Sequence, residues 1–150
     1  MEPPRIRLRD VTMDDADLLL GWRNDPLTRQ MSRDRDAVER NDHVAWLART
    51  LALDAGRRRI CIAVADGTPV GTVRLDRVDD GVCELSWTMA PEARGQGLGR
   101  EMVSAFCRMT GGRLRAVVRA GNAASRRIAI SAGLSPIRID GDLEYFEGDF

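Results

Sequence analysis

A glycine-rich stretch at residues 92–102, EARGQGLGREM, has the residue types best suited to binding an anion. Its glycines and flanking arginines are Gly95, Gly97, Gly99, Arg94 and Arg100. A helix that begins here would leave its first backbone N–H groups without partners, and the helix dipole would favour a negative charge. Glycine permits positive φ and close approach of a phosphate to the backbone, while arginine adds charge-assisted hydrogen bonds. The stretch therefore predicts a phosphate-binding loop.

The spacing of these glycines narrows the kind of phosphate ligand. A P-loop ends in Gly-Lys-Ser/Thr, and the chain contains no lysine. A dinucleotide-binding fingerprint has the spacing GxGxxG, whereas residues 95–99 have the spacing GxGxG. Both motifs are excluded, and a glycine-rich connection without a ligand stays open as the alternative.

The elements that must position this loop follow from the pattern of apolar residues. A strand is expected at residues 6–8, followed by a helix that begins with a capping box at Thr12 and Asp15. The polar segment 22–40 contains a proline and predicts a loop or a broken helix. Asn41 is expected to cap the next helix, over residues 41–51.

The rest of the chain predicts hairpins and strand–helix units. We expect strands at 60–65, 70–76, 82–89 and 114–119, helices at 97–109 and 122–133, and a last hairpin over 136–146. This order mixes an antiparallel meander with two strand–helix units. It predicts an α+β fold with a mixed, mostly antiparallel central sheet of about seven strands flanked by about four helices.

Length and composition bound the class of protein. A chain of 150 residues is expected to form a single domain, residues 1–150. Its charges balance at 23 basic and 23 acidic residues, so neither nucleic acid nor a membrane is expected as a partner. No apolar run approaches the ~18 residues of a membrane span, and residues 1–10 lack the apolar core of a signal peptide.

The three cysteines, Cys61, Cys83 and Cys107, lie far apart in apolar runs. This arrangement predicts buried, reduced thiols rather than disulfides or a metal site. We therefore expect a cytoplasmic protein without a bound metal.

Two motifs together resemble a known family. Residues 94–99, Arg-Gly-Gln-Gly-Leu-Gly, follow a strand that ends in Trp-Thr-Met and are similar to the coenzyme A loop of the GNAT superfamily of N-acetyltransferases. Residues 122–134, NAASRRIAISAGL, are similar to the Asn-x-x-Ser/Ala helix of that family, which ends in Gly-Phe. The resemblance runs from the first strand to the last hairpin. It implies the GNAT fold and acetyl-CoA as the cosubstrate.

The resemblance also implies which residues hold the coenzyme. The backbone of Met89 would pair with the pantetheine arm where two parallel strands splay, and Asn122 would hydrogen-bond that arm. As an alternative, Asn122 is a plain helix cap. The arginines at 126 and 127 could reach the adenosine phosphate, and the alternative for them is an exposed, solvated pair. The implied coenzyme-binding residues are Met89, Arg94, Gly95, Gln96, Gly97, Leu98, Gly99, Arg100, Asn122, Ser125 and Arg127.

Acetyl transfer needs a base for the amine and a proton for the leaving thiolate. The tyrosine that commonly supplies this proton in the family is replaced by Ala129, so water, Ser131 or Tyr145 would have to substitute. Glu84 matches a Glu-x-Gly/Ser-Tyr/Trp pattern of one branch and is a candidate base. His43, the sole histidine, titrates in a useful range and is also a catalytic candidate. The alternatives are a solvent-facing strand residue for Glu84 and a surface or capping residue for His43.

The N-terminal half resembles one branch of the superfamily. LLLGWRNDPLTRQM followed by HVAWL is similar to the nucleotide-aminosugar N-acetyltransferases of pseudaminic acid biosynthesis. Tryptophan faces would stack on sugar or base rings, arginine would grip a diphosphate, and asparagine and aspartate would read hydroxyl groups. As an alternative, the two tryptophans are core anchors. The residues that carry this resemblance are Trp22, Arg23, Asn24, Asp25, Met31, His43 and Trp46.

Three functional hypotheses follow from these residues. The first is acetyl transfer, by direct attack on the thioester, to the primary amine of a nucleotide-linked aminosugar. The second is acetylation of a protein N-terminal amine, as in the RimJ/RimL-like members of this branch, or of a small-molecule amine. The third, which Ala129 keeps open, is a catalytically silent coenzyme A-binding sensor. The expected partner is a small-molecule amine acceptor, and a homodimer is compatible with this assignment.

Overall fold

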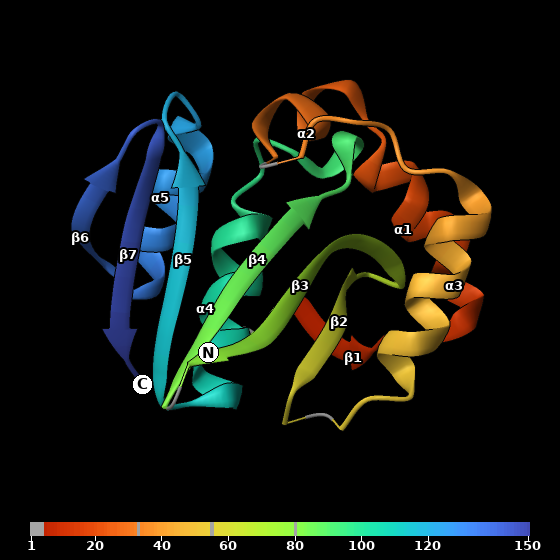
Figure 1. Ribbon diagram of the computed structural model, residues 1–150, viewed down its shortest axis with the longest axis horizontal. Helices are drawn as coiled ribbons and strands as arrows, with labels where there is room; N and C mark the ends of the chain where they lie inside the picture. Colours follow the sequence, from red (N-terminus) through yellow and green to blue (C-terminus); the bar gives the residue numbers. More distant parts are fainter. Residues whose placement is uncertain (1–4, 33, 55, 80) are drawn as a thin grey trace.

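The residues that this computed structural model describes, 5–32, 34–54, 56–79 and 81–150, form a mixed sheet with the strand order β1-β2-β3-β4-β5-β7-β6 (Figure 1). Its strands are β1 (Ile6–Asp10), β2 (Arg58–Ala65), β3 (Thr68–Asp79), β4 (Val82–Met89), β5 (Arg113–Arg119), β6 (Ser135–Asp140) and β7 (Leu143–Asp149). Its helices are α1 (Ala16–Arg23), α2 (Pro26–Met31), α3 (Arg40–Leu51), α4 (Leu98–Thr110) and α5 (Ala123–Ala132). The predicted α+β class and seven-stranded, mostly antiparallel sheet are confirmed.

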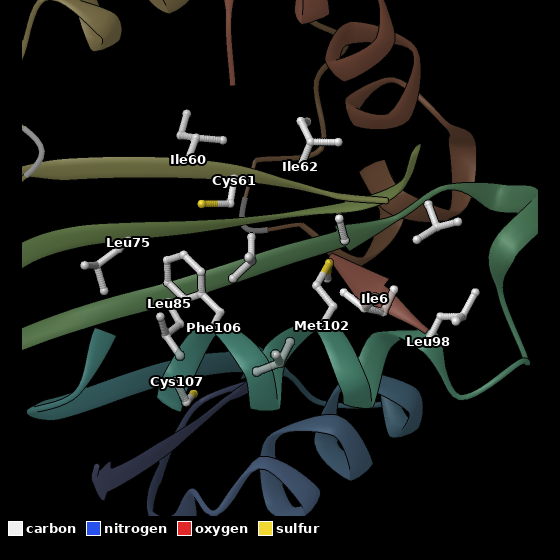
Figure 2. Close-up of a cluster of buried hydrophobic side chains, with 14 of the residues drawn as sticks. Ile6, Ile60, Cys61, Ile62, Leu75, Leu85, Leu98, Met102, Phe106 and Cys107 are labelled. Carbon is white, nitrogen blue, oxygen red and sulfur yellow. The ribbon is translucent and has the colours of Figure 1, made fainter. Parts of the chain in front are cut away.

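The hydrophobic core covers both faces of β2, because successive side chains of a strand point to opposite faces. Figure 2 shows Ile60 and Ile62 pointing away from α4, whereas Met102 and Phe106 of α4 lie against the other side of the strands. All four side chains are at most 6% exposed. Two layers of helix therefore hold the sheet between them.

β4 and β5 run parallel but stay together for only part of their length. Their register pairs Val82–Leu85 with Arg113–Ala116, and beyond these residues the two strands part (Figure 1). The last residues of β4, 86–89, consequently have no strand partner on the β5 side within the described part of the chain. The splay of parallel strands that was expected beside Met89 is present.

Local signals explain where several elements begin and end. The capping box of Thr12 and Asp15 is formed and leads into α1. The turn between β2 and β3 has positive φ at Asp66 and Gly67, 49° and 76°, which suits the right-handed twist of a hairpin. Gly133 ends α5 in the left-handed conformation. These elements agree with the sequence-based prediction.

Two details differ from the prediction. Asn41 does not cap α3, because the helix begins at Arg40 after Glu39 and Asn41 lies within its first turn. The polar segment contains the short helix α2, since Asp25 caps it and Pro26 occupies its first turn, so the described residues form five α-helices rather than about four. The predictions that fall on residues 1–4, and the part of the polar segment at residue 33, lie outside the described residues.

Burial accounts for the state of the cysteines. Cys61, Cys83 and Cys107 are free, and burial raises the pKa of the Cys61 and Cys107 thiols to about 11. Both thiols therefore stay protonated and unreactive at neutral pH.

Among the helices in the described ranges, none is long and apolar enough to span a bilayer.

Asp15 fastens β1 to the start of α1, and its loss should destabilise the fold. Its carboxylate accepts hydrogen bonds from the Arg9 guanidinium at 2.8 and 2.9 Å and from the Thr12 backbone N–H at 2.8 Å. The Arg9 guanidinium also lowers the pKa of Asp15 below its ordinary value of 3.8. We expect Asp15→Asn to lower the free energy of unfolding by about 1–3 kcal/mol at neutral pH, because hydrogen bonds to a charged group are weakened.

Urea unfolding at neutral and acidic pH measures this effect. The lowered pKa stabilises the fold above the unfolded value, so the difference between wild type and variant should shrink as the pH falls through the folded pKa. The exposed pair of Asp149 with Arg113 provides a control, and Asp149→Asn should change stability by less than about 0.5 kcal/mol. Equal losses in the two variants would contradict the structural role of Asp15.

Candidate functional site

A cleft of about 780 Å³ opens beside the splay of β4 and β5. Its floor includes Thr72, Arg74 and Ser86, which share one face of β3 and β4, and its walls come from α1, α3 and the connection between them. Eight residues of interest from the sequence line it: Trp22, Arg23, Met31, His43, Trp46, Glu84, Asn122 and Ser125. The fold therefore brings candidates from both halves of the chain into one cavity.

The glycine loop, defined here as Arg94–Arg100, connects the end of β4 to α4. Gly97 is the N-cap of this 13-residue helix, with φ at 76°, and Gly95 has φ at 77°. The backbone N–H groups of residues 95–97 donate to no acceptor in the part of the chain that the structure describes. Free N–H groups at the start of a helix form an anion site, so the loop fits a phosphate group by its own geometry.

Gly99 serves a different purpose from the other two glycines. Positive φ is present at Gly95 and Gly97 but not at Gly99. A β-carbon on Gly99 would lie 2.8 Å from Cδ1 of Ile128, which belongs to α5. Glycine here leaves room for the Ile128 side chain and so for the close approach of α4 and α5.

The two arginines of the glycine loop have different surroundings. The Nη2 atom of Arg94 donates to the Asp25 carboxylate at 2.6 Å and to the Thr28 hydroxyl at 3.1 Å, so this side chain turns towards α2. Arg100 has no hydrogen-bond or ion-pair partner among the described residues, and its Nη2 atom would lie 3.3 Å from a β-carbon on Gly97. Arg100 is thus the arginine whose donors stay available beside the free N–H groups.

Arg5 is a further cation at the glycine loop, and the sequence did not reveal it. Its Nη2 atom donates to the Gln96 carbonyl at 3.3 Å, and the side chain also pairs with Glu101. The contact spans 91 positions in the sequence, so it depends on the packing of β1 beside α4 and has no local signal.

His43 places a neutral, uncommitted nitrogen in the cleft. Its side chain is buried, and its Nε2 atom has no hydrogen-bond partner among the described residues. Burial lowers the pKa of His43 below its ordinary value of 6.5, against the opposing effects of a hydrogen bond to the Ala16 backbone and of the Asp17 carboxylate. The imidazole is therefore neutral at neutral pH and able to accept a proton.

Trp46 forms the adjoining wall and is held by an ion-paired frame. Its ring stacks on His43 with 5.7 Å between centroids, and the guanidinium groups of Arg58 and Arg74 lie 5.8 and 5.4 Å from the Trp46 ring. Both arginines bond to the carboxylate of Asp76, at 2.5 and 2.6 Å. Sequence reasoning missed this frame, whose only signal is a pair of oppositely charged residues at positions 74 and 76, two apart on β3 and so on one face of it. The frame restrains the orientation of the Trp46 ring.

Glu84 lies where β4 and β5 are still paired, and Asn122 follows β5 beyond the point where they part. Glu84 is opposite Asp76 on β3 and Arg115 on β5 in the sheet register, so its side chain shares the cleft face with theirs. Asn122 caps α5, because its Oδ1 atom accepts a hydrogen bond from the Ser125 backbone N–H at 3.2 Å. This confirms the capping role, and it leaves the NH₂ group of Asn122 to donate to a ligand.

Arg23 and Trp22 lie at the end of α1. The Nη2 atom of Arg23 donates to the Asp34 carbonyl at 2.8 Å, whereas its Nη1 atom is buried without an acceptor among the described residues. A buried guanidinium N–H without an acceptor favours a ligand that carries an anionic group. Trp22 is 5% exposed and belongs to the hydrophobic core as well as to the cleft wall, so the core-anchor interpretation holds for it.

Several predicted site residues do not line the cleft. Asn24 makes two hydrogen bonds of 2.8 Å to the backbone of Val38, and Asp25 caps α2 and pairs with Arg94. Because both side chains brace the α1–α3 segment, their predicted contact with acceptor hydroxyl groups finds no support in this arrangement. Tyr145 lies on β7 with the Arg138 guanidinium 4.1 Å from its ring centre, and Arg127 is exposed on α5. Neither is among the described residues that line the cleft.

Comparison with known proteins finds relatives in sequence. The family model described as "Acetyltransferase (GNAT) domain" matches residues 5–135. A mycothiol acetyltransferase of Thermomonospora curvata is 30% identical over 118 residues, which cover 77% of this chain and 40% of that protein. The chain therefore spans less than half the length of this relative.

Solved structures share the fold. A Salmonella typhimurium protein, solved with its cofactor acetyl-CoA, has a TM-score of 0.76 at 18% identity, covering 97% of this chain and 94% of its own. A ribosomal-protein-alanine N-acetyltransferase from Brucella melitensis has a TM-score of 0.74 at 23% identity, covering 96% and 99%. These similarities confirm the expected GNAT fold.

The buried, neutral state of His43 can be measured directly, because the chain has one histidine. We expect its imidazole resonances to titrate below 6.5 in NMR spectra, since burial opposes the charged form. By linkage, His43 stabilises the fold fully above 6.5, and this contribution is lost as the pH falls through the lowered pKa; His43→Gln should remove that pH dependence. A titration at or above 6.5 would contradict the neutral assignment.

Proposed function

The chain belongs to the acetyltransferase (GNAT) domain family, and on that premise we propose that it transfers the acetyl group of acetyl-CoA to a primary amine. The observation that carries this proposal is the set of free backbone N–H groups in the glycine loop, at the end of the strand that parts from β5. A diphosphate needs several such donors at once, and the loop offers them without rearranging a hydrogen-bonded element.

Different residues around the splay would bind different parts of the coenzyme. The N–H groups from Gly95 to Arg100 would hold the diphosphate, with the Arg100 guanidinium beside them. The free backbone edge of β4 at Met89 and the NH₂ group of Asn122 would hold the pantetheine arm. When bound there, acetyl-CoA supplies a thioester, whose acyl carbon an amine can attack directly.

His43 is the base that the geometry favours. A buried, neutral imidazole with a free Nε2 atom can take a proton from the attacking amine, and this supports His43 over a surface role. Glu84, on the cleft face of β4, is the second candidate and would act directly or through a water molecule. Ala129 stands at the position of the missing tyrosine, and its methyl side chain has no proton to donate. A thiolate with a pKa near ~8.5 can leave with water as the proton source.

For the acceptor, we propose an aminosugar linked to a nucleotide. The indole of Trp46, fixed by its arginine frame, suits stacking on a sugar or base ring, and the unmatched N–H of Arg23 suits a phosphate oxygen. The alternative acceptor is the N-terminal amine of a protein, which the similarity to a ribosomal-protein-alanine N-acetyltransferase favours. A coenzyme A-binding sensor without turnover is the alternative outside enzymes.

A thiol-release assay with a panel of acceptors tests the function. Acetyl-CoA is mixed with the protein and with UDP-linked aminosugars, free aminosugars or peptides that begin with alanine. We expect release of free thiol with the UDP-linked aminosugars, and a mass increase of one acetyl group on their amines. Turnover with peptides alone would move the assignment to protein N-termini. Binding of acetyl-CoA without turnover on the panel would contradict the enzyme proposal.

Replacement of Gly97 tests whether the glycine loop binds the diphosphate. Gly97→Val should weaken acetyl-CoA binding several-fold or more in calorimetry, because a β-carbon strains the left-handed backbone and enters the space beside Arg100. Gly67→Val is a matched control: Gly67 has the same φ of 76° in the β2–β3 turn, with nothing within 4 Å of an added β-carbon. Equal effects of the two variants on affinity, or none, would remove the loop from the diphosphate site.

His43 and Glu84 can be separated by their effects on turnover. His43→Ala should reduce turnover by about 10²- to 10⁴-fold at saturating acceptor while the affinity for acetyl-CoA stays unchanged. Glu84→Gln should have the smaller effect of the two. Steady-state rates with the acceptor found in the panel, together with calorimetry, give both quantities. Normal turnover of the His43 variant would exclude it as the base.

A further inference from the structure

Arg94 opens the glycine loop, but its side chain is bound to α2. Its Nη2 atom donates to the Asp25 carboxylate at 2.6 Å and to the Thr28 hydroxyl at 3.1 Å. The pair is partly shielded, with 33% of the Arg94 side chain and 17% of the Asp25 side chain exposed. The Arg94 guanidinium also lowers the pKa of Asp25, so the pair stays ionised at neutral pH.

The same short helix is fastened on the other side of the splay. Arg119, at the end of β5, donates from Nη2 to the carbonyl of Ser32 at 2.9 Å, and Ser32 is the C-cap of α2. Its Nη1 atom pairs with Asp142 at 2.5 Å. One end of α2 is therefore tied to the glycine loop after β4, and the other end is tied to β5. This helix lies above the C-terminal end of β4 (Figure 1).

Apart from the packing of its buried residues Leu98 and Gly99, the glycine loop has two further side-chain hydrogen bonds to the described residues. The amide of Gln96 donates to the Glu92 carbonyl at 3.2 Å, and Arg5 donates to the Gln96 carbonyl at 3.3 Å. Both contacts involve the middle of the loop and are exposed. The bond to Asp25 is the shorter, charge-assisted contact, and it acts where the chain enters the loop.

We propose that Asp25 is a positioning residue for the donor site, which holds Arg94 against α2 and so fixes the glycine loop in the conformation that binds a diphosphate. The inference rests on the proposed function and adds to it, because Asp25 acts through Arg94 and touches neither the coenzyme nor the acceptor. Arg94 is then a tether of the loop, and the phosphate contacts fall to the backbone N–H groups and Arg100.

The alternative role of Arg94, as a direct ligand of phosphate, predicts effects of opposite sign. If Asp25 held Arg94 away from the phosphate, its removal would free a cation and strengthen binding. If Asp25 positions the loop, its removal lets the loop sample other conformations, and the cost of ordering it weakens binding. The sign of the change in affinity therefore separates the two roles.

The experiment compares Asp25→Asn, Arg94→Gln and the double variant. Asparagine keeps the capping of α2 but loses the charge that pairs with Arg94, so the helix should survive the substitution. Calorimetry measures the dissociation constants of coenzyme A, which contains the diphosphate, and of pantetheine, which does not. Asp17→Asn removes an exposed pair with Arg40 and serves as the control.

We expect both single variants to raise the dissociation constant of coenzyme A by about five- to tenfold. The double variant should show no larger effect than either single one, since both remove the same contact. The dissociation constant of pantetheine in these variants, and that of coenzyme A in the Asp17 variant, should match wild type. Tighter coenzyme A binding in Asp25→Asn, additive losses in the double variant, or an equal loss for pantetheine would overturn the proposal.

Limited proteolysis tests, in the absence of a ligand, whether Asp25 holds the Arg94 side chain. Trypsin should cut after Arg94 several-fold faster in Asp25→Asn than in wild type, because the side chain is no longer held against α2. An unchanged rate of this cut would overturn the proposal. If the wild-type protein bound no coenzyme A, the proposed function would fail, while the proteolysis result would still decide whether Asp25 holds the loop.

Discussion

The parting of β4 and β5 is the constraint on which the rest of the site depends. Their pairing covers Val82–Leu85 and Arg113–Ala116 and then stops, so the end of β4 keeps one edge of backbone groups without a strand partner in the described structure. Buried backbone donors and acceptors must be satisfied, and an extended ligand can satisfy them as an added strand would. The glycine loop follows β4 after a single short turn, Pro91–Ala93, and Asn122 lies shortly after the end of β5. The separation of the two strands therefore creates a space for an extended ligand, with the glycine loop at one side of it and Asn122 at the other.

The acceptor half is built by a different kind of interaction. Its walls depend on charged pairs that orient aromatic rings, chiefly the bonds from Arg58 and Arg74 to Asp76 that flank Trp46. These bonds leave the ring restrained and His43 buried beside it. Burial lowers the pKa of the imidazole, so its nitrogen is neutral at neutral pH and can accept a proton from an amine. The Nε2 atom of His43 thus lacks a hydrogen-bond partner among the described residues at a position where a bound amine could provide one.

Local patterns were enough to predict several helix caps and the turn residues of the glycine loop. The capping box at Thr12, the glycine spacing of residues 95–99 and the cap at Asn122 are set by neighbours within a few positions, and each is found in the structure. Contacts between distant segments left no such signal. Arg94 has the residue type and position of a phosphate ligand, yet it bonds to Asp25, 69 positions away. Asn24 and Asp25 have the chemistry to read hydroxyl groups, but both brace the chain, because tertiary packing decides which polar atoms stay free.

The central claim is that free backbone N–H groups of the glycine loop receive the diphosphate of acetyl-CoA. Titration of isotope-labelled protein with acetyl-CoA, followed by amide NMR, tests it most directly. The account predicts saturable shifts of the Gly95 and Gly97 resonances, as these N–H groups gain acceptors, while Gly67, with the same φ as Gly97, keeps its position. Saturable binding that leaves the loop amides unchanged, or no binding at all, would contradict it.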